Sequence, residues 1–511
     1  MNTITEEERG LIRRADTWLA GHREEFIRLL RGWVAIPSIC DESQNDAEHP
    51  LGSAVSDMFS RASADMRALG VKVDLHDGYA ISMALDHGRY ITGAPIGGDD
   101  EIGMVGHLDV VPAGDGWTYQ PFALELDDRG FAYGRGVADC KGPSLVDLCV
   151  LRMMHDLEVP LRHRLRVILG GGEETSMNDL KGYLKRHQAP GFSLVTDGPF
   201  PVNYGQKGIL QLVLGISAPG IWNGWQAGSA ANAVPGEADI LIDGIAASEI
   251  EDAARRCGGP YAQRITCATE NGRVRIHAKG EAGHAAFQNG TLNAIGLLSG
   301  FLEDSNLLVA HGRAAEHAAA EAIHLIAGAT DGTGLGIACA DESGPLSFNL
   351  GVARPNRGAR LALVCDSRYP VGFHGSAIIA KLRDAVASFP ARWDVRIDEI
   401  HDEPAYRIDP NGVEATTLSD AFDAFFNTHK PAFTMGGGTH SRLLPRSVTF
   451  GADFWYMDDI AEKTGIPGKP DGMDADHGGG HTADECVNID HLMTAAKLYM
   501  LAVSRLDKVL A

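Results

Sequence analysis

The sequence has no run of about 18 consecutive apolar residues, so it predicts no transmembrane helix. Its first residues, Met1–Thr5, lead into three glutamates and lack the basic and apolar regions of a signal peptide. The eight cysteines form no Cys-x-x-Cys pair. This scatter is typical of free thiols in a reducing compartment rather than of a disulfide framework. Together these absences predict a cytoplasmic protein.

Positive charge is also scarce. The chain has 45 lysines and arginines against 68 aspartates and glutamates, which gives a formal net charge of −23 at pH 7. An acidic surface repels nucleic acids and anionic membranes, so neither is expected as a partner.

The pattern of apolar residues predicts two domains within the 511 residues. In residues 1–205, strand-like runs alternate with amphipathic helical segments, which predicts an α/β domain: a mostly parallel sheet with helices on both faces. Residues 206–402 mix strand-like runs with alanine-rich helical segments, which predicts an inserted α+β domain. Residues 403–511 return to the first pattern and complete the first domain. Asparagine-containing segments at 231–235 and 349–352, each expected as a loop before a strand, favour two related halves in the insert.

The first candidate site residues follow the apolar run Ile102–Val105. His107 could bind zinc, and Asp109 could hold its second ring nitrogen. The alternative is a strand-end histidine with Asp109 as a turn cap. Asp139 could bridge two cations with its two carboxylate oxygens or could be an ordinary turn aspartate. Cys140 could offer a soft ligand, although a neighbouring side chain usually points away.

A second acidic pair, Glu173 and Glu174, follows the strand-like run at 165–169. Adjacent carboxylates repel each other unless cations hold them or one of them carries a proton. One metal ligand and one general base would explain the pair, and two solvated loop glutamates are the alternative. Asp197 closes the next strand-like run, at 192–196.

The late chain offers two histidines, His477 and His481, separated by three glycines. His481 is preferred because these glycines give it slack to reach a site, and a helix begins soon after it. His477 is the alternative ligand, and a surface loop without a metal is the other interpretation. Taken together, two histidines and several carboxylates at strand ends fit two metal ions that share one carboxylate.

Over most of its length, from about residue 20, the sequence resembles a family of co-catalytic di-zinc metallopeptidases. This family includes carboxypeptidase G, aminoacylase, succinyl-diaminopimelate desuccinylase and bacterial dipeptidases of the dipeptidase V type. The motifs that carry the resemblance are Gly106–Pro112, Tyr133–Gly142, Gly172–Thr175, Asp197, Gly283–Ala285 and His481-x-x-x-Glu485. The dipeptidase V type is favoured by the long insert and by two further segments, Gly205–Gly208 and Gly436–Leu444.

Carried over by position, the resemblance implies two divalent ions, most simply Zn²⁺, with Mn²⁺ or Co²⁺ as alternatives. One ion would be held by His107, Asp139 and Asp197. The other would be held by Asp139, Glu174 and His481. Cys140 departs from the acid that close relatives often have there, which should leave these ligands intact.

The resemblance also implies roles for residues around the ions. Asp109 would orient His107, and Glu173 would be the general base. The inserted domain would form a lid, and His284 within it would stabilise the oxyanion. The Asp139–Cys140 peptide bond would be cis. His284 could instead be a surface histidine of the lid.

The implied activity is that of a dipeptidase, and an N-acyl-amino-acid or N-succinyl amidohydrolase with the same site is the alternative. The resemblance thus implies a small-molecule substrate, a dipeptide or an N-acyl amino acid, and a monomer or homodimer. Four residues match substrate-contacting positions: Asn232, Arg368, Gly437 and Thr439. An arginine suits a substrate carboxylate because its planar fork can bind both oxygens. Arg368 could instead have a structural role in its turn.

Overall fold

The computed structural model describes residues 3–46, 48–93, 96–217, 224–285, 288–356, 360–455, 457–474 and 476–510. The chain divides into two compact units. Unit 1 comprises Met1–Gly205, Arg407–Thr434 and Gly438–Ala511, and unit 2 comprises Gln206–Tyr406 and Met435–Gly437. The chain returns to unit 1 after Tyr406, whereas the sequence predicted a return after residue 402. The sequence did not predict that the short segment 435–437 belongs to unit 2.

A sheet of ten strands, counted over the described residues, organises unit 1. Its order is β1-β2-β7-β4-β8-β24-β9-β22, with β3 paired to β2 and β23 paired to β9. The central strands β7, β4, β8 and β24 are parallel, and β1, β2 and β9 pair antiparallel. The predicted α/β class is therefore confirmed. The strands are β1 (Asp74–His76), β2 (Ala80–Asp86), β3 (Arg89–Ile91), β4 (Gly98–His107), β7 (Arg164–Gly170), β8 (Pro190–Val195), β9 (Asn203–Gln206), β22 (Tyr406–Arg407), β23 (Phe433–Met435) and β24 (Ser447–Thr449).

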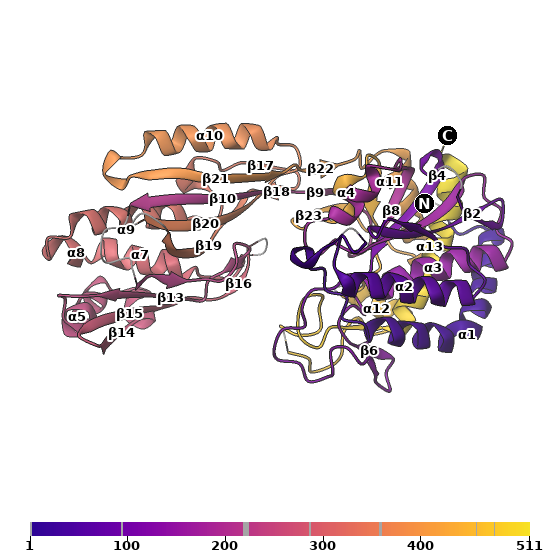
Figure 1. Ribbon diagram of the computed structural model, residues 1–511, viewed down its shortest axis with the longest axis horizontal. Helices are drawn as coiled ribbons and strands as arrows, with labels where there is room; N and C mark the ends of the chain where they lie inside the picture. The colour runs from indigo at the N-terminus through magenta and orange to yellow at the C-terminus, as the bar shows by residue number, and fades with distance from the viewer. Residues whose placement is uncertain are drawn as a thin grey trace. The chain divides into compact units, whose positions relative to one another are not determined.

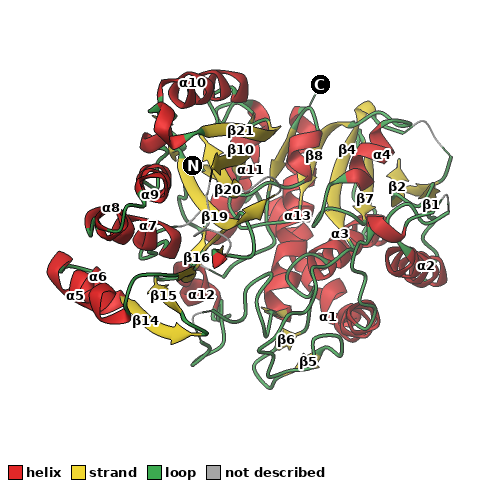
Figure 2. Ribbon diagram, turned by 60° about the vertical axis from the view of Figure 1, so that its left-hand side comes forward, coloured by secondary structure: helices red, strands yellow, loops and turns green. Residues whose placement is uncertain are grey.

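Helices cover this sheet on both faces (Figures 1 and 2). A large apolar core joins one face to the long helices, and a smaller core around Leu180 and Tyr183 lies on the other. The helices of unit 1 are α1 (Glu6–Val34), α2 (Ser53–Ala68), α3 (Lys141–Asp156), α4 (Asn178–Leu184), α11 (Val413–Phe426), α12 (Asp458–Thr464) and α13 (Ile489–Val509). None of the helices in the described ranges is long and apolar enough to cross a membrane.

Local chemistry sets the helix ends. Thr5 and Glu8 form a capping box that starts α1, because each side chain accepts the backbone N–H of the other residue. α3 begins at Lys141, so Gly142 and Pro143 lie in its first turn. Proline is tolerated there because the first-turn N–H groups of a helix have no partner within the helix.

Unit 2 contains a separate antiparallel sheet, with eight strands among the residues that the structure describes, and its own apolar core. Its order is β14-β15-β13-β11-β19-β20-β10-β21. The two halves of this strand order, β14-β15-β13-β11 and β19-β20-β10-β21, share one arrangement: β15 lies between β13 and β14, and β10 lies between β20 and β21. The strands are β10 (Gly208–Ser217), β11 (Gln226–Ala227), β13 (Glu237–Ile242), β14 (Ile265–Glu270), β15 (Arg273–Lys279), β19 (Ser347–Asn356), β20 (Arg360–Tyr369) and β21 (Val395–Glu403).

Each half carries a helix between matching strands: α5 links β13 to β14, and α10 links β20 to β21. The helices of unit 2 are α5 (Ala247–Cys257), α6 (Tyr261–Arg264), α7 (Ala294–Asp304), α8 (Leu307–Ala310), α9 (Ala314–Ala327) and α10 (Gly375–Ser388). Residues 349–352, expected as a loop, lie inside β19 instead. The amide of Asn349 fits there because it is buried and donates to the carbonyls of Ala231 and Ala233.

Candidate metal centre

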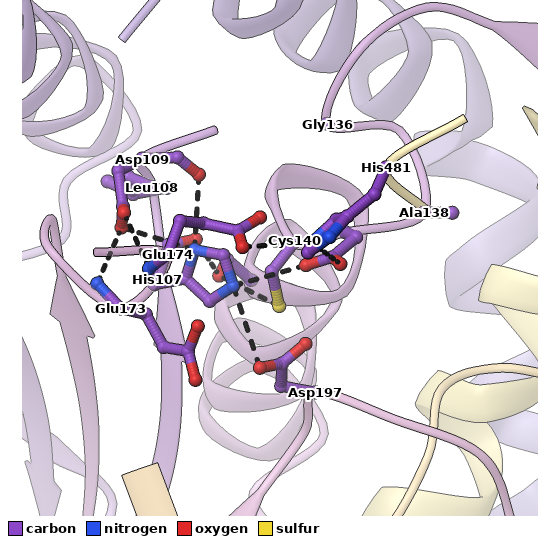
Figure 3. Close-up of polar contacts among 12 residues, drawn as sticks. His107, Leu108, Asp109, Gly136, Ala138, Cys140, Glu173, Glu174, Asp197 and His481 are labelled. Carbon is purple, nitrogen blue, oxygen red and sulfur yellow. Dashed lines mark hydrogen bonds and ion pairs between the residues drawn. The ribbon is translucent and has the colours of Figure 1, made fainter. Parts of the chain in front are cut away.

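Three neighbouring parallel strands of unit 1 bring the site together. His107 is the last residue of β4, the Glu173–Glu174 pair follows β7, and Asp197 follows β8. Because β7, β4 and β8 are adjacent and parallel, their carboxyl ends lie at one edge of the sheet. The side chains converge there, as Figure 3 shows.

His107 lies at the centre of the cluster and is fully buried. Its Nδ1 lies 3.2 Å from Asp109 Oδ1 and 3.1 Å from the Asp109 carbonyl oxygen. Its Nε2 lies 3.2 Å from Asp139 Oδ1 and 3.5 Å from Asp197 Oδ2. One ring nitrogen is thus held by Asp109, while the other faces two carboxylates.

Asp109 also anchors the acidic pair that follows β7. Its Oδ1 accepts the backbone N–H of Glu173 at 3.2 Å, and its Oδ2 accepts that of Glu174 at 3.0 Å. Asp109 is fully buried, and both of its carboxylate oxygens accept hydrogen bonds from protein groups. One carboxylate therefore fixes the orientation of His107 and the backbone of both glutamates.

His481 is the late histidine that reaches this cluster. Its Nε2 lies 2.8 Å from Glu174 Oε2 and 3.2 Å from Asp139 Oδ2. His477 instead places its Nδ1 3.0 Å from Asp484, a carboxylate that also accepts two backbone N–H groups of the 118–119 segment. The structure therefore brings His481, and not His477, to Asp139.

Glu485 is a site residue to which the sequence analysis gave no role. Its buried carboxylate accepts the backbone N–H groups of Gly136, Ala138 and Asp139 at 2.9–3.1 Å. It also pairs with the buried Arg135 at 2.6 Å. The motif His481-x-x-x-Glu485 marks the position of Glu485 in the sequence but does not indicate what its carboxylate contacts. Glu485 holds the loop that presents Asp139, whose peptide bond to Cys140 is cis.

A second buried pair, His440 and Asp179, supports the loop before the glutamates. His440 Nε2 lies 3.0 Å from Asp179 Oδ2, and that oxygen also accepts the backbone N–H of Gly172 at 3.0 Å. Both side chains are buried. No local pattern in the sequence pointed to this pair, because its members lie 261 positions apart.

The ionisation of these groups reflects burial among like charges. Burial and the neighbouring Asp197 raise the pKa of Glu173 well above its usual range. Burial and Asp139 raise the pKa of Glu174 to about 7. Burial opposes ionisation of Asp139 as well, but the adjacent imidazoles of His107 and His481 outweigh burial and lower the pKa of Asp139. Contacts with Asp139 and Glu174 raise the pKa of His481 to about 11.

The donor set fits divalent cations. Within the described residues, His107 Nε2, Glu173 Oε1 and Glu174 Oε1 are buried atoms with no hydrogen-bond partner. Two groups of three side chains place their ligand atoms within 4.8 Å of one another. They are His107, Asp139 and Glu174, and His107, Cys140 and Asp197. Imidazole and carboxylate groups are usual ligands of Zn²⁺, and cations would relieve the repulsion among these acids.

Cys140 lies within the cluster, fully buried. Its Sγ lies 3.8 Å from the Thr196 carbonyl oxygen, and burial raises the pKa of the thiol well above its usual range. A protonated thiol is a poor metal ligand compared with a thiolate. The carboxylates therefore remain the better candidates.

Two predicted residues of unit 2, Asn232 and His284, lie side by side. His284 is exposed in β16 (Gly283–His284), which pairs with β12 (Ala233–Val234) directly after Asn232. The backbone carbonyl of Asn232 accepts the N–H of Ala285 at 2.8 Å. The backbones of the two residues therefore lie side by side at one small two-stranded sheet.

The remaining predicted substrate contacts have protein partners. Arg368 forms a two-point contact with Asp366, at 2.7 and 3.0 Å, and donates to the Gly436 carbonyl next to Gly437. Thr439 is buried, caps the short helix His440–Leu443 and lies 3.1 Å from the Thr449 hydroxyl. Gly437 belongs to unit 2 and Thr439 to unit 1.

Comparison with known sequences identifies relatives that match nearly the whole chain. The chain is 29% identical over 494 residues to the putative dipeptidase YtjP of Bacillus subtilis, covering 95% of this chain and 98% of that protein. It is 26% identical over 510 residues to the Beta-Ala-Xaa dipeptidase of Lactobacillus delbrueckii subsp. lactis, covering 95% and 97%.

Solved structures share the fold at low identity. The dipeptidase Dug1p of Saccharomyces cerevisiae is 15% identical with a TM-score of 0.53, covering 98% of both chains. The M20 family metallo-carboxypeptidase Sso-CP2 of Sulfolobus solfataricus is 13% identical with a TM-score of 0.53, covering 95% of this chain and all of the other. The family model for peptidase family M20/M25/M40 matches residues 103–505. The chain therefore belongs to peptidase family M20/M25/M40.

Proposed function

We propose that this peptidase is a di-metal dipeptidase that uses Glu173 as its general base. The observation that carries the proposal is the convergence of His107, Asp139, Glu174 and His481 around buried atoms that lack partners. The curated relatives named as dipeptidases support the substrate class. Their likeness extends over nearly the full length of both chains, including the residues of unit 2.

In this proposal one ion would be held by His107, Asp139 and Asp197, and the other by Asp139, Glu174 and His481. Asp139 suits the shared position because its Oδ1 faces His107 and its Oδ2 faces His481. When bound, such ions lower the pKa of a water molecule and polarise a carbonyl group. Asp109 orients His107, and Glu485 holds the loop that presents Asp139.

Glu173 takes the proton of the attacking water and passes it to the leaving amine. Its carboxylate suits this task because its Oε1 is buried and has no partner among the described residues. Its backbone is fixed by Asp109, so the side chain is presented at a constant position. A raised pKa also brings a carboxyl group closer to the pH at which it can both accept and donate.

We assign supporting roles to four residues of unit 2 and to Thr439 of unit 1 on the basis of the family motifs. His284 would donate a hydrogen bond to the developing oxyanion, and Asn232 beside it would bind the substrate backbone. Arg368 would bind the terminal carboxylate, with Gly437 and Thr439 from the glycine-rich segment as further contacts. The exposure of His284 and its pairing next to Asn232 are compatible with these roles.

The test is a panel of dipeptides and N-acyl amino acids, assayed after chelation and after adding back Zn²⁺, Mn²⁺ or Co²⁺. We expect dipeptide hydrolysis that is lost on chelation and restored by at least one ion. Cleavage of the acyl substrates alone would replace the dipeptidase proposal with an amidohydrolase.

A further inference from the structure

Two aspartate–histidine pairs hold the segment that leads into the acidic pair after β7. Three successive backbone N–H groups, of residues 172–174, bind carboxylate oxygens at 3.0–3.2 Å. Asp179 accepts the first of them, and Asp109 accepts the other two. Each aspartate also contacts a buried histidine: Asp109 contacts His107, and Asp179 contacts His440. The proposed mechanism uses the first pair, whereas the second pair has no role in it.

The orientation of the Asp179 carboxylate depends on His440. The Nε2 atom of His440 lies 3.0 and 3.2 Å from the two carboxylate oxygens, and both side chains are buried. Burial opposes ionisation of Asp179, but the contacts with His440 and with backbone N–H groups outweigh burial and lower its pKa. An ionised carboxylate only accepts hydrogen bonds, so the Nε2–H group of His440 is the donor. The remaining contact of Oδ1 is with the backbone N–H of Leu180, at 2.6 Å.

This pair packs against the end of β7. A Cβ atom on Gly170 would lie 2.0 Å from Asp179 Oδ2 and 3.0 Å from His440 Cε1, so a glycine is needed there to leave room for the pair. The His440 ring also stands edge-on to His107, with ring centroids 6.3 Å apart. The pair therefore lies where the strand passes into the segment that carries Glu173.

Glu173 depends on its backbone for its position. Its Oε1 atom is buried and has no hydrogen-bond partner among the described residues, so no contact of that atom holds the carboxylate in place. The three residues before it, 170–172, are glycines and have no side chains that could anchor the segment. Glycine also has more backbone freedom than other residues. The hydrogen bond from the Gly172 N–H to Asp179 is therefore an important restraint on the approach to Glu173.

We propose that His440 and Asp179 are positioning residues for Glu173, because they fix the peptide group that leads into Gly172. Neither side chain touches the substrate in this proposal. A reacting group misplaced by about 1 Å loses roughly 10²-fold in rate, so the effect should appear in kcat. The ions should be little affected, since Asp109 still holds the N–H of the ligand Glu174. The inference rests on the proposed function, in which Glu173 is the general base.

A second buried pair of the same kind lies at the other end of β7 and provides a matched control. His163 directly precedes the strand, and its Nδ1 lies 3.0 Å from Asp507 Oδ1. Asp507 also accepts the backbone N–H groups of residues 162 and 163, at 2.8–3.0 Å. The two side chains are 8% and 4% exposed, and neither belongs to a candidate ligand group. This pair therefore matches the first in burial and contacts but not in location.

The test compares His440→Phe with His163→Phe. Each change keeps an aromatic ring and removes the donor to a buried aspartate, so both variants should unfold at lower urea concentration than the wild type. Only His440→Phe should lower kcat, by about 10–100-fold, for the dipeptide that the wild type cleaves best. KM should change less than about threefold, and the metal content per chain should stay at the wild-type level in both variants.

Two further measurements separate the hydrogen bond from the packing of the ring. The amide of His440→Gln can place an N–H near the position of Nε2, whereas that of His440→Asn lies nearer to Nδ1. The glutamine variant should therefore recover most of the kcat that the phenylalanine variant loses, and the asparagine variant should not. Deuterium exchange of the Gly172 N–H, followed by mass spectrometry, needs no substrate. It should be at least about tenfold faster in His440→Phe and unchanged in His163→Phe.

Several outcomes would overturn the inference and leave the dipeptidase proposal standing. They are a wild-type kcat in His440→Phe, an equal loss of kcat in His440→Phe and His163→Phe, and equal kcat values for His440→Gln and His440→Asn. A loss of metal in proportion to kcat would also overturn it, because the pair would then support an ion rather than the base. If the wild type cleaves only N-acyl amino acids, the dipeptidase proposal fails. The same comparison made with those substrates still decides the role of the pair.

Discussion

At the scale of single residues, a variant of Glu173 tests proton transfer separately from metal binding. Its carboxylate is not needed to hold an ion in the proposed arrangement, whereas it moves the proton in both steps. Replacing it by glutamine should lower kcat about 10²–10⁴-fold, the range for general acid–base groups. Metal content measured by mass spectrometry should stay close to that of the wild type.

Glu462→Gln in α12 is the control for this experiment, since it removes the same charge from an exposed residue that belongs to no candidate ligand group. Near-normal turnover of Glu173→Gln would contradict the assignment. A parallel loss of metal would show instead that Glu173 is a ligand.

Asp109 should act through other residues rather than on the substrate. Its two oxygens hold His107 and the N–H groups of Glu173 and Glu174. Asp109→Asn replaces one acceptor oxygen by a donor, which disturbs these contacts. Partners of this kind typically contribute 10–100-fold to metal affinity.

A chelator-competition titration measures this effect. We expect weaker metal binding by about 10–100-fold and partial recovery of kcat at saturating metal. An unchanged metal affinity would contradict the orienting role of Asp109.

At the scale of elements, the strand-end rule explains what the sequence could predict. The apolar runs before His107, Glu173 and Asp197 are readable locally, and parallel neighbours bring their ends together. The roles of Glu485 and of the His440–Asp179 pair were not readable, because their partners are distant in sequence and largely backbone groups. Every residue except proline has a backbone N–H group, so a contact with such a group leaves no pattern in the sequence.

The contact between Glu485 and the loop before α3 makes a measurable prediction. Glu485→Gln would leave the buried Arg135 charge without its counter-ion, and breaking a buried pair in this way costs about 3–5 kcal/mol. We expect a loss of that order in the unfolding free energy of unit 1, measured by urea denaturation. The exposed Asp471–Arg129 pair is the comparison, and Asp471→Asn should change stability little. Equal effects of the two variants would show that Glu485 does not brace the loop.

At the scale of the whole molecule, the two units have separate apolar cores, and all proposed metal ligands belong to unit 1. A ligand that binds only the folded form stabilises the unit that holds it, by RT ln(1 + [L]/Kd). The carboxylates of the metal centre would also repel one another once cations are removed. Metal removal should therefore destabilise one unit selectively.

Differential scanning calorimetry with and without a chelator tests this selectivity. We expect two transitions, of which only one falls by several degrees on chelation and returns when metal is added. A His107→Ala variant identifies that transition, because it should already melt at the lower temperature and respond less to chelator. Equal shifts of both transitions, or none, would contradict a metal centre built from unit 1 alone. His284 is not a proposed ligand, so His284→Ala should keep the metal-dependent shift of the wild type. The same variant should lower kcat, because it removes the proposed donor to the oxyanion. Calorimetry and turnover measurements together therefore separate metal binding from catalysis.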